Sequence, residues 1–585
     1  MTATDPLLTL AERSGFQETG RSDEVAALCA AFARTWPDAV RCFEFGRSAE
    51  RRAMQALIVS RVALSAHSLR QARIPVLMIQ AGIHPGESDG KDAGFIALRE
   101  MLSGSCAASA LEHIALLFVP AFNVDGHERV GRWNRPNQNG PRETGWRTTA
   151  QNLNLNRDYL KAAAPEMQAM LRLIDAWDPL LCADLHVTDG ADFEPDVSIQ
   201  VEPINQGDER LRPIGLQLRD ELIAKLAHHG SLPLPFYPDL AISDDPMSGF
   251  LLTVYSPRFS TGYFPQRNRF TMLVETHSWK NYARRVAVTR NCIVGLAELV
   301  AAHGSAWLAA ALEADAAAAQ LGGREVVLDY ASGWREPTQA GAAIDARADV
   351  AGSELIEFRG YAYTRSPSPI SGNLVTVYDP KTPQLWRVPY RKQVHPSLTV
   401  TAPLGGYFVP PGYAALVGAK LDLHGISYLT LTSGRGGAAI DAFRATRAQF
   451  SAAPFEGRMR LTLDGDWRSE TRDIGAGALF VPVAQPLARL VLALLEPQAP
   501  DSLAAWGYFN ACFEQKEHME PYVAEQIARD MAAADPRLAI EFERRLTDPE
   551  FARDAHARLE FFLRRHSSWD ENYNLYPVLR CPERG

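Results

Sequence analysis

The chain has few cysteines, and none of them has the spacing of a metal site. Its 585 residues contain seven, an odd number scattered from Cys29 to Cys581. Such sparse cysteines argue against a disulfide framework and against a Cys-rich zinc site. No internal repeat is present either, so a solenoid or another repeat architecture is not expected.

Long apolar runs and dense basic clusters are also missing. No apolar run approaches the roughly 20 residues that a membrane span requires, so we expect no membrane span. The net charge of −9 and the lack of a Lys/Arg cluster argue against a nucleic-acid partner. The N-terminus, MTATDPLLTLAERSG, has no basic segment and no long apolar core. As written it predicts a cytoplasmic protein without a signal peptide, and a removed leader of a periplasmic or secreted protein is the alternative.

Residues 1–322 alternate between apolar runs and amphipathic segments such as 91–102 and 165–177. This alternation predicts an α/β domain with a mixed, mostly parallel sheet and helices on both faces. Two helices, over 283–304 and 305–323, are expected to close the domain. The expected strands are 56–60, 76–80, 115–120, 180–185, 198–202 and 270–275.

The sequence pattern changes twice after this domain. Short alternating runs separated by turn residues fill 323–483, which predicts a β-rich, sandwich-like domain. From 484 to 585 the pattern is helical again, as in EPYVAEQIARDMAAADPRLAIEFERRL. A chain of this length is expected to form several domains, and these boundaries predict three.

Polar side chains follow four of the expected strands. VLMIQAGI is followed by HPGE, with His84 and Glu87; LLCADL is followed by His186; and FTMLV is followed by Glu275. A fourth run, ALLFVPAF, is followed by Asn123 and Asp125. Ligands of open α/β sheets bind at the carboxyl ends of the strands, so these residues are expected to meet.

Two imidazoles and a carboxylate form the ligand pattern of catalytic zinc sites, which leave a fourth position open for water. Zinc suits two imidazoles better than magnesium does, and iron or cobalt would fit almost as well. A metal-bound water becomes acidic enough to act as the nucleophile near neutral pH, and the remaining carboxylate can take its proton. A lone histidine at a strand end is more often structural, but four coincidences at one edge favour one metal ion.

In combination, HPGE, a later Asn-Arg pair, a strand that ends in His and a strand that ends in Glu resemble the zinc carboxypeptidase (funnelin) family over about residues 50–300. The resemblance implies a zinc metallopeptidase, a hydrolase that removes the C-terminal residue of peptides. It assigns the metal to His84, Glu87 and His186 and the general base to Glu275.

The run NLNLNRDY supplies the Asn-Arg pair as Asn156 and Arg157. In the family this pair grips the free C-terminal carboxylate of the peptide substrate, and a planar guanidinium suits that task because it can bind a carboxylate through two parallel hydrogen bonds. The alternative is that Arg157 is a surface arginine that forms a salt bridge.

Two further roles in the family have several candidates here. For the arginine that stabilises the oxyanion, GRWNRPNQNGPRETGWR offers Arg132, Arg135, Arg142 and Arg147, and its distance from Asn156 favours Arg135. For the family's mobile tyrosine, Tyr255 and Tyr263 both qualify. The side-chain specificity of the substrate and the role of residues 323–585 stay open.

One position departs from the family pattern. The aspartate that usually supports a metal-bound histidine is replaced by Asn154. An amide oxygen can orient the ring but raises the basicity of the ligand less than a carboxylate does. We therefore expect weaker metal binding or lower activity, or a substitute carboxylate such as Asp125 or Asp158.

Two rival interpretations remain. The same ligand set and the run DLHVT also resemble the aspartoacylase and succinylglutamate desuccinylase group, which cleaves N-acyl amino acids. A third hypothesis is a metal-binding protein without turnover, in which the C-terminal half carries the function. The presence of Glu275 argues against it, because a site that only binds metal needs no base.

Overall fold

The computed structural model describes residues 5–332 and 353–583. An eight-stranded sheet forms the centre of the N-terminal part, in the order β1-β2-β4-β3-β5-β10-β6-β7. The neighbours β4, β3, β5 and β10 are all parallel, whereas β1, β2 and β6 pair antiparallel. The strands are β1 (Val40–Arg47), β2 (Ala53–Val59), β3 (Val76–Ala81), β4 (Ala115–Val119), β5 (Leu181–Val187), β6 (Val197–Glu202), β7 (Pro233–Leu234) and β10 (Phe270–Thr276).

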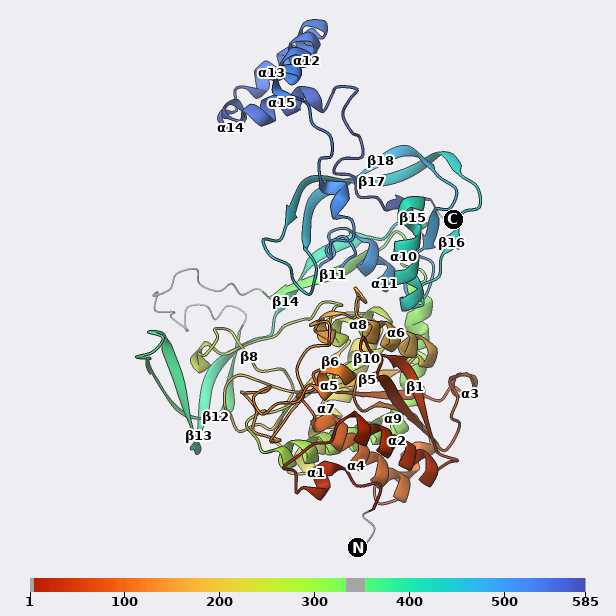
Figure 1. Cartoon of the computed structure of the whole chain (residues 1–585), viewed down its shortest axis with the longest axis vertical. Helices are drawn as coiled ribbons and strands as arrows, with labels where there is room; N and C mark the ends of the chain where they lie inside the picture. The colour runs from red at the N-terminus through yellow and green to blue at the C-terminus, as the bar shows by residue number, and fades with distance from the viewer. Residues whose placement is uncertain (1–4, 333–352, 584–585) are drawn as a thin grey trace.

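Helices cover both faces of this sheet (Figure 1). One face carries α2 (Ser22–Thr35), α4 (Asp89–Ser103), α7 (Arg212–His228) and α9 (Tyr282–Ala318). The other carries α6 (Pro165–Trp177) and α8 (Ser260–Gln266). Short helices α1 (Leu10–Arg13), α3 (Ala66–Gln71) and α5 (Val124–Glu128) lie in the connections. The predicted fold class, a mixed and mostly parallel α/β sheet, is confirmed.

The two helices expected at the end of this domain form one continuous helix, α9. Gly304 does not break it: a Cβ there would lie 2.8 Å from Pro75 Cγ, so the missing side chain allows close packing on the start of β3. By length and composition α9 could span a membrane, which the sequence analysis did not expect. However, 56% of its apolar window is buried inside the protein, as in a core helix.

The β-rich region divides its strands among three sheets. The six-stranded sheet has the order β16-β19-β15-β20-β17-β18, and β11 (Glu325–Ser332) pairs with β14 (Val394–Thr401). The third sheet joins the hairpin of β12 (Glu354–Pro367) and β13 (Leu374–Arg391) to β9 (Phe250–Leu251) and β8 (Asp239–Leu240). The strands of the six-stranded sheet are β15 (Gly406–Val409), β16 (Leu429–Thr430), β17 (Arg435–Phe450), β18 (Leu461–Ile474), β19 (Leu479–Pro482) and β20 (Leu579–Cys581).

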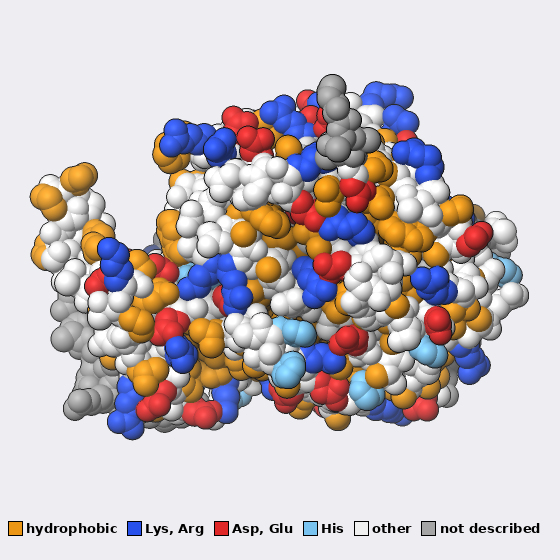
Figure 2. All heavy atoms as spheres, turned by 90° about the horizontal axis from the view of Figure 1, so that it is seen from below, with side chains coloured by type: hydrophobic (Ala, Val, Ile, Leu, Met, Phe, Trp, Pro, Cys, Tyr) orange, Lys and Arg blue, Asp and Glu red, His pale blue; other side chains and the backbone are white. Residues whose placement is uncertain are grey.

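Strand pairing crosses both expected domain boundaries. β8 and β9 come from the segment before residue 322 and pair with the β-rich region, while β20 comes from the last segment and pairs with β15 and β17. Strand pairing alone does not delimit domains, so the division into 1–322, 323–483 and 484–585 stays a prediction. On the face seen in Figure 2, acidic and basic side chains are interspersed, and the β12–β13 hairpin projects at one side.

The region after residue 402 has two differently attached parts (Figure 1). The six-stranded sheet, α10 (Pro411–His424) and α11 (Ala488–Leu495), here called the C-terminal body, share one continuous apolar core with the α/β domain. The helices α12 (Pro521–Ala534), α13 (Pro536–Arg545), α14 (Pro549–Arg553) and α15 (Ala555–Leu563), here called the helical module, have a separate core around Phe551, Phe561 and Phe562. Figure 1 shows this module standing away from the rest of the protein.

Candidate metal centre and substrate pocket

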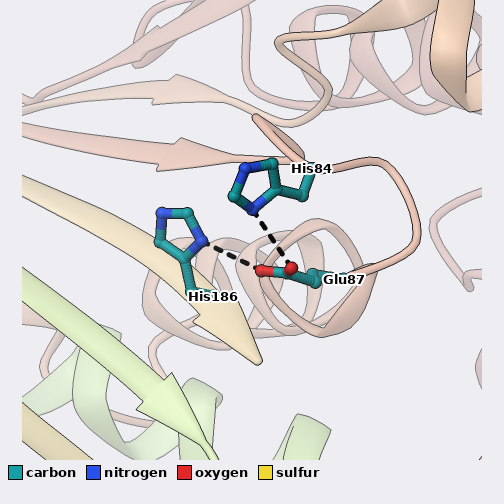
Figure 3. A group of neighbouring side chains, drawn as sticks. All are labelled: His84, Glu87 and His186. Atoms are coloured by element: carbon teal, nitrogen blue, oxygen red, sulfur yellow. Dashed lines mark hydrogen bonds and ion pairs between the residues drawn. The ribbon is translucent and has the colours of Figure 1, made fainter. Parts of the chain in front are cut away.

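Three predicted ligands meet at the carboxyl ends of the central strands (Figure 3). His186 lies in β5, and His84 and Glu87 occupy the turn between β3 and α4. One donor atom from each residue can be chosen so that all three lie within 4.8 Å of one another. Glu87 bridges the two rings, with Oε2 2.9 Å from His186 Nδ1 and Oε1 3.1 Å from His84 Nδ1. The strand-end pattern thus brings both imidazoles and the carboxylate together.

The turn that holds His84 and Glu87 is closed by the Glu87 amide, which donates to the His84 carbonyl at 2.9 Å. Gly86 lies under the loop of residues 135–145, and a Cβ there would be 2.5 Å from Arg135 Cγ and 3.0 Å from the Gly145 carbonyl oxygen. Only a residue without a side chain allows this close approach, so HPGE is shaped both by its own turn and by the loop above it.

The outer nitrogens of the two imidazole rings face different partners. His84 Nε2 lies 3.1 Å from Asn154 Oδ1, which also accepts the Asn156 amide. An amide oxygen only accepts, so Nε2 carries the proton and the Nδ1 lone pair faces Glu87. His186 Nε2 lies 3.1 Å from Asp184 Oδ2, within ion-pair distance although not aligned as a regular hydrogen bond.

Neither carboxylate suggested from the sequence as a substitute supports a histidine. Asp125 contacts Ser48 and Arg52, and Asp158 contacts Lys161 and the first amides before α6. Asn123 caps α5 instead of joining the metal centre. The fourth strand end therefore contributes nothing to the cluster, because its side chains satisfy the local backbone and the β1–β2 turn.

Burial and charge prepare these groups for a cation. Burial lowers the pKa of His84 to about 4, so its ring is neutral near pH 7. Its Nδ1 is buried and, among the described residues, has no hydrogen-bond partner. For Glu87, burial raises the pKa, but His84 and Arg135 outweigh this and keep the carboxyl ionised. A neutral imidazole with an unused lone pair beside a buried carboxylate fits Zn²⁺.

Glu275 lies next to the cluster on β10, directly paired in register with His186. Its Oε2 is buried without a hydrogen-bond partner in the described part of the chain. Burial raises the pKa of Glu275 to about 8, and nearby Glu87 and Asp189 act in the same direction. A pKa near the working pH suits a group that takes up and gives back a proton.

These four residues line one pocket of about 210 Å³, together with Asn156 and Arg157. Arg157 pairs with no carboxylate among residues 5–332 and 353–583; its Nη1 donates to the Asn156 carbonyl and its guanidinium lies over the Phe259 ring. Burial lowers the pKa of Arg157 to about 10, with Arg147 and Arg258 adding to the effect. The salt-bridged surface arginine considered above is not what the structure has.

The candidate arginines for the oxyanion differ in position. Arg135 is largely buried, with Nη1 3.0 Å from Glu87 Oε1 and Nη2 on the Val187 carbonyl, and it lines a separate hollow beside the N-terminal segment. Arg147 lines the pocket with its side chain 39% exposed and Nη1 3.3 Å from Glu87 Oε1. Arg132 stacks on Trp133, and Arg142 lies near Glu18. The role of Arg135 stays a prediction.

The two candidate tyrosines are also separated. Tyr255 lines the pocket, whereas Tyr263 is fully buried and its hydroxyl contacts His424 Nδ1 at 2.9 Å. Tyr237 lines the pocket as well and was missed by the sequence analysis. No motif surrounds Tyr237, so only its position in the fold reveals it.

Comparison with known proteins gives one family and a set of similar folds. The family model described as zinc carboxypeptidase matches residues 25–192. Curated proteins gave no significant match. Similar solved structures include a putative carboxypeptidase A from Shewanella denitrificans (17% identity, 48% of this chain, 69% of that chain, TM-score 0.36). Another is a metallo-carboxypeptidase from Burkholderia cenocepacia (18% identity, 48% of this chain, 68% of that chain, TM-score 0.34). A third is carboxypeptidase A from Helicoverpa armigera (17% identity, 51% of this chain, 75% of that chain, TM-score 0.35).

The matched segment contains His84, Glu87 and His186 and ends before Glu275. It confirms the resemblance that the sequence motifs indicated. Residues 25–192 of this chain match the zinc carboxypeptidase family model.

Proposed function

We propose that the protein is a zinc-dependent metallocarboxypeptidase that hydrolyses the C-terminal peptide bond of peptides. One observation carries the proposal: the pocket that holds His84, Glu87, His186 and Glu275 also contains Arg157, a half-buried guanidinium without a carboxylate partner in the described chain. A buried cation without a counter-charge is costly unless a ligand supplies the charge. A free terminal carboxylate would do so.

His84, Glu87 and His186 would hold one zinc ion. The bound ion would supply Lewis acidity, which acidifies water and polarises the scissile carbonyl. Glu275 accepts a proton from the attacking water and delivers it to the leaving nitrogen. The C–N bond breaks and a C–O bond forms, so the products are a shortened peptide with a new carboxylate and a free amino acid.

Asn156 and Arg157 orient the substrate. The Asn156 side-chain NH2 can donate a hydrogen bond to a carboxylate, and the Arg157 fork can donate two parallel hydrogen bonds to it. For the developing oxyanion, Arg135 is the candidate from the sequence, and Arg147 is the one with access to the pocket. Tyr255 is better placed than Tyr263 because Tyr255 lines the pocket.

The test compares peptides with free and amidated C-termini. Amidation removes the charge and leaves Arg157 unpaired, so kcat/KM should fall by roughly two to three orders of magnitude, about 3 to 4 kcal/mol. Arg157→Lys should lower activity on the free peptide and remove the preference, because a point charge cannot replace the fork. Zinc analysis of each sample provides the control.

Equal cleavage of both peptides would contradict the carboxypeptidase proposal. A panel of N-acyl amino acids, run beside the peptides, distinguishes the aspartoacylase-like alternative. Stoichiometric zinc with no turnover of either class would leave the third hypothesis, a protein that binds metal without catalysis.

A further inference from the structure

Asp184 is a fully buried carboxylate on the same strand as the proposed metal ligand His186. It lies in β5 two residues before His186, so both side chains point to the same face of the sheet. Asp184 Oδ2 is 3.1 Å from His186 Nε2, the ring nitrogen that faces away from Glu87. The carboxylate therefore lies on the side of the imidazole opposite the proposed metal position.

The environment of Asp184 holds its carboxylate in one orientation. The Gln80 side-chain amide donates to Oδ1 at 2.8 Å, and the Ser260 hydroxyl donates to Oδ2 at 2.6 Å. Gln80 is itself fixed, because the Tyr159 hydroxyl donates to its Oε1 at 2.7 Å. β3, β5, α8 and the segment before α6 thus converge on this one carboxylate.

No lysine or arginine in the described ranges 5–332 and 353–583 forms an ion pair with Asp184; its partner at ion-pair distance is the His186 ring, which carries a charge only when it is protonated. Burying a carboxylate without a cation is costly, and apolar residues in a sheet core cost less. A nearby divalent cation, reached through the imidazole, would supply the missing positive charge.

We propose that Asp184 is the positioning residue for the metal ligand His186, and that it does for this histidine what the carboxylate missing at position 154 would do for His84. Asp184 lies at ion-pair distance from Nε2, so it would hold the proton on that nitrogen, direct Nδ1 toward the metal and make the imidazole a stronger donor. Asn154 only orients His84 through a neutral amide. In this protein the supporting carboxylate lies beside His186 instead of beside His84. This inference rests on the proposed zinc site.

The test measures zinc affinity of the full-length protein by competition with a chelator. Asp184→Asn keeps the size and removes the charge, and it should weaken zinc binding about 10- to 100-fold. Adding Asn154→Asp to that variant places a carboxylate on His84 instead and should recover most of the loss. The visible absorption of the cobalt-substituted protein should shift in Asp184→Asn, because it responds to the donor strength of the ligands.

Asp158→Asn is the matched control. Asp158 is equally buried but touches none of the three ligands, so its loss can lower the melting temperature of the metal-free protein without changing zinc affinity or the cobalt spectrum. A general effect of removing a buried carboxylate would appear in both variants. A positioning role appears only in Asp184→Asn.

The outcomes separate this inference from the proposed function. A wild-type protein that binds no zinc refutes the metal site itself. A folded Asp184→Asn variant with wild-type zinc affinity refutes only the role of Asp184. If Asp184→Asn does not fold, Ser260→Ala decides: it removes the hydroxyl that fixes Asp184 Oδ2 and should weaken zinc binding by a smaller factor, and unchanged affinity overturns the proposal.

Discussion

The two walls of the pocket are held in different ways. His186 and Glu275 lie on neighbouring strands of the eight-stranded sheet, and His84 directly follows the next strand. Asn156 and Arg157 lie in the irregular segment around Leu155–Arg157, outside any sheet. The strand-held wall, which carries the proposed metal ligands and base, therefore depends on the sheet. The loop-held wall, which carries Asn156 and Arg157, the residues proposed to bind substrate, depends on what packs against its loop.

What packs against the loop is the C-terminal body. Glu456, in the turn between β17 and β18, accepts the Asn154 amide at 2.8 Å. Asp501 accepts the amide of Arg258 at 3.0 Å, and Arg258 precedes Phe259, the ring under Arg157. The Tyr508 hydroxyl reaches the Lys161 carbonyl from the same side. The C-terminal body and the segment after it thus support the loop that carries Asn156 and Arg157, the residues proposed to bind substrate.

The largest effect is expected on the strand-held wall. Glu275→Gln keeps the shape and removes the base, so kcat should fall by roughly 10² to 10⁴, with KM and bound zinc unchanged. Steady-state kinetics and metal analysis of the purified variant measure this. Normal turnover would remove Glu275 from the reaction and with it the distinction between the two walls.

A smaller effect of a different kind is expected from the C-terminal body. Asp501→Asn removes the charge that holds Arg258, so Phe259 and Arg157 are less well fixed. We expect KM for free peptides to rise about tenfold with kcat little changed, since a hydrogen bond to a charged group contributes about 1.5 to 3 kcal/mol.

The matched control for Asp501→Asn is Asp548→Asn, which alters only the N-cap of α14 in the helical module and should leave KM unchanged. If Asp501→Asn instead lowered kcat with KM constant, the C-terminal body would support the strand-held wall, and the comparison would be wrong.

The smallest effect is expected from the helical module. Residues 515–519 and 568–573 line one small hollow, so the two ends of the module lie together and a short Gly-Ser linker can replace residues 520–567. The module has its own core, and its removal should change kcat/KM by less than about twofold. Kinetics and thermal unfolding of the deletion variant measure this, and a loss of activity would mean that the module contributes to a wall.

The sequence predicted the strand-held wall better than the loop-held wall. His84, Glu87, His186 and Glu275 follow apolar runs, and the ends of parallel strands meet whatever the loops do. The structure brings all four to one pocket. Asp184 was missed, although its position two residues before His186 in a buried strand was a usable signal.

Sequence spacing is a weaker guide where loops set the positions of side chains. Arg135 was preferred over Arg147 by its distance from Asn156 along the chain, but the loop folds back, so that Arg135 lies against Glu87 and Arg147 lines the pocket. The contacts of Glu456 and Asp501 join residues more than 200 positions apart. No local pattern encodes such pairs, because they depend on tertiary packing.

The position of β20 sets the order in which the enzyme can be assembled. β20 lies between β15 and β17, so the six-stranded sheet cannot close until Cys581 has been synthesised. His84 and His186, by contrast, are in the first third of the chain. The residues proposed as metal ligands, His84 and His186 among them, are therefore synthesised long before the strand that completes the C-terminal body beside Asn156 and Arg157.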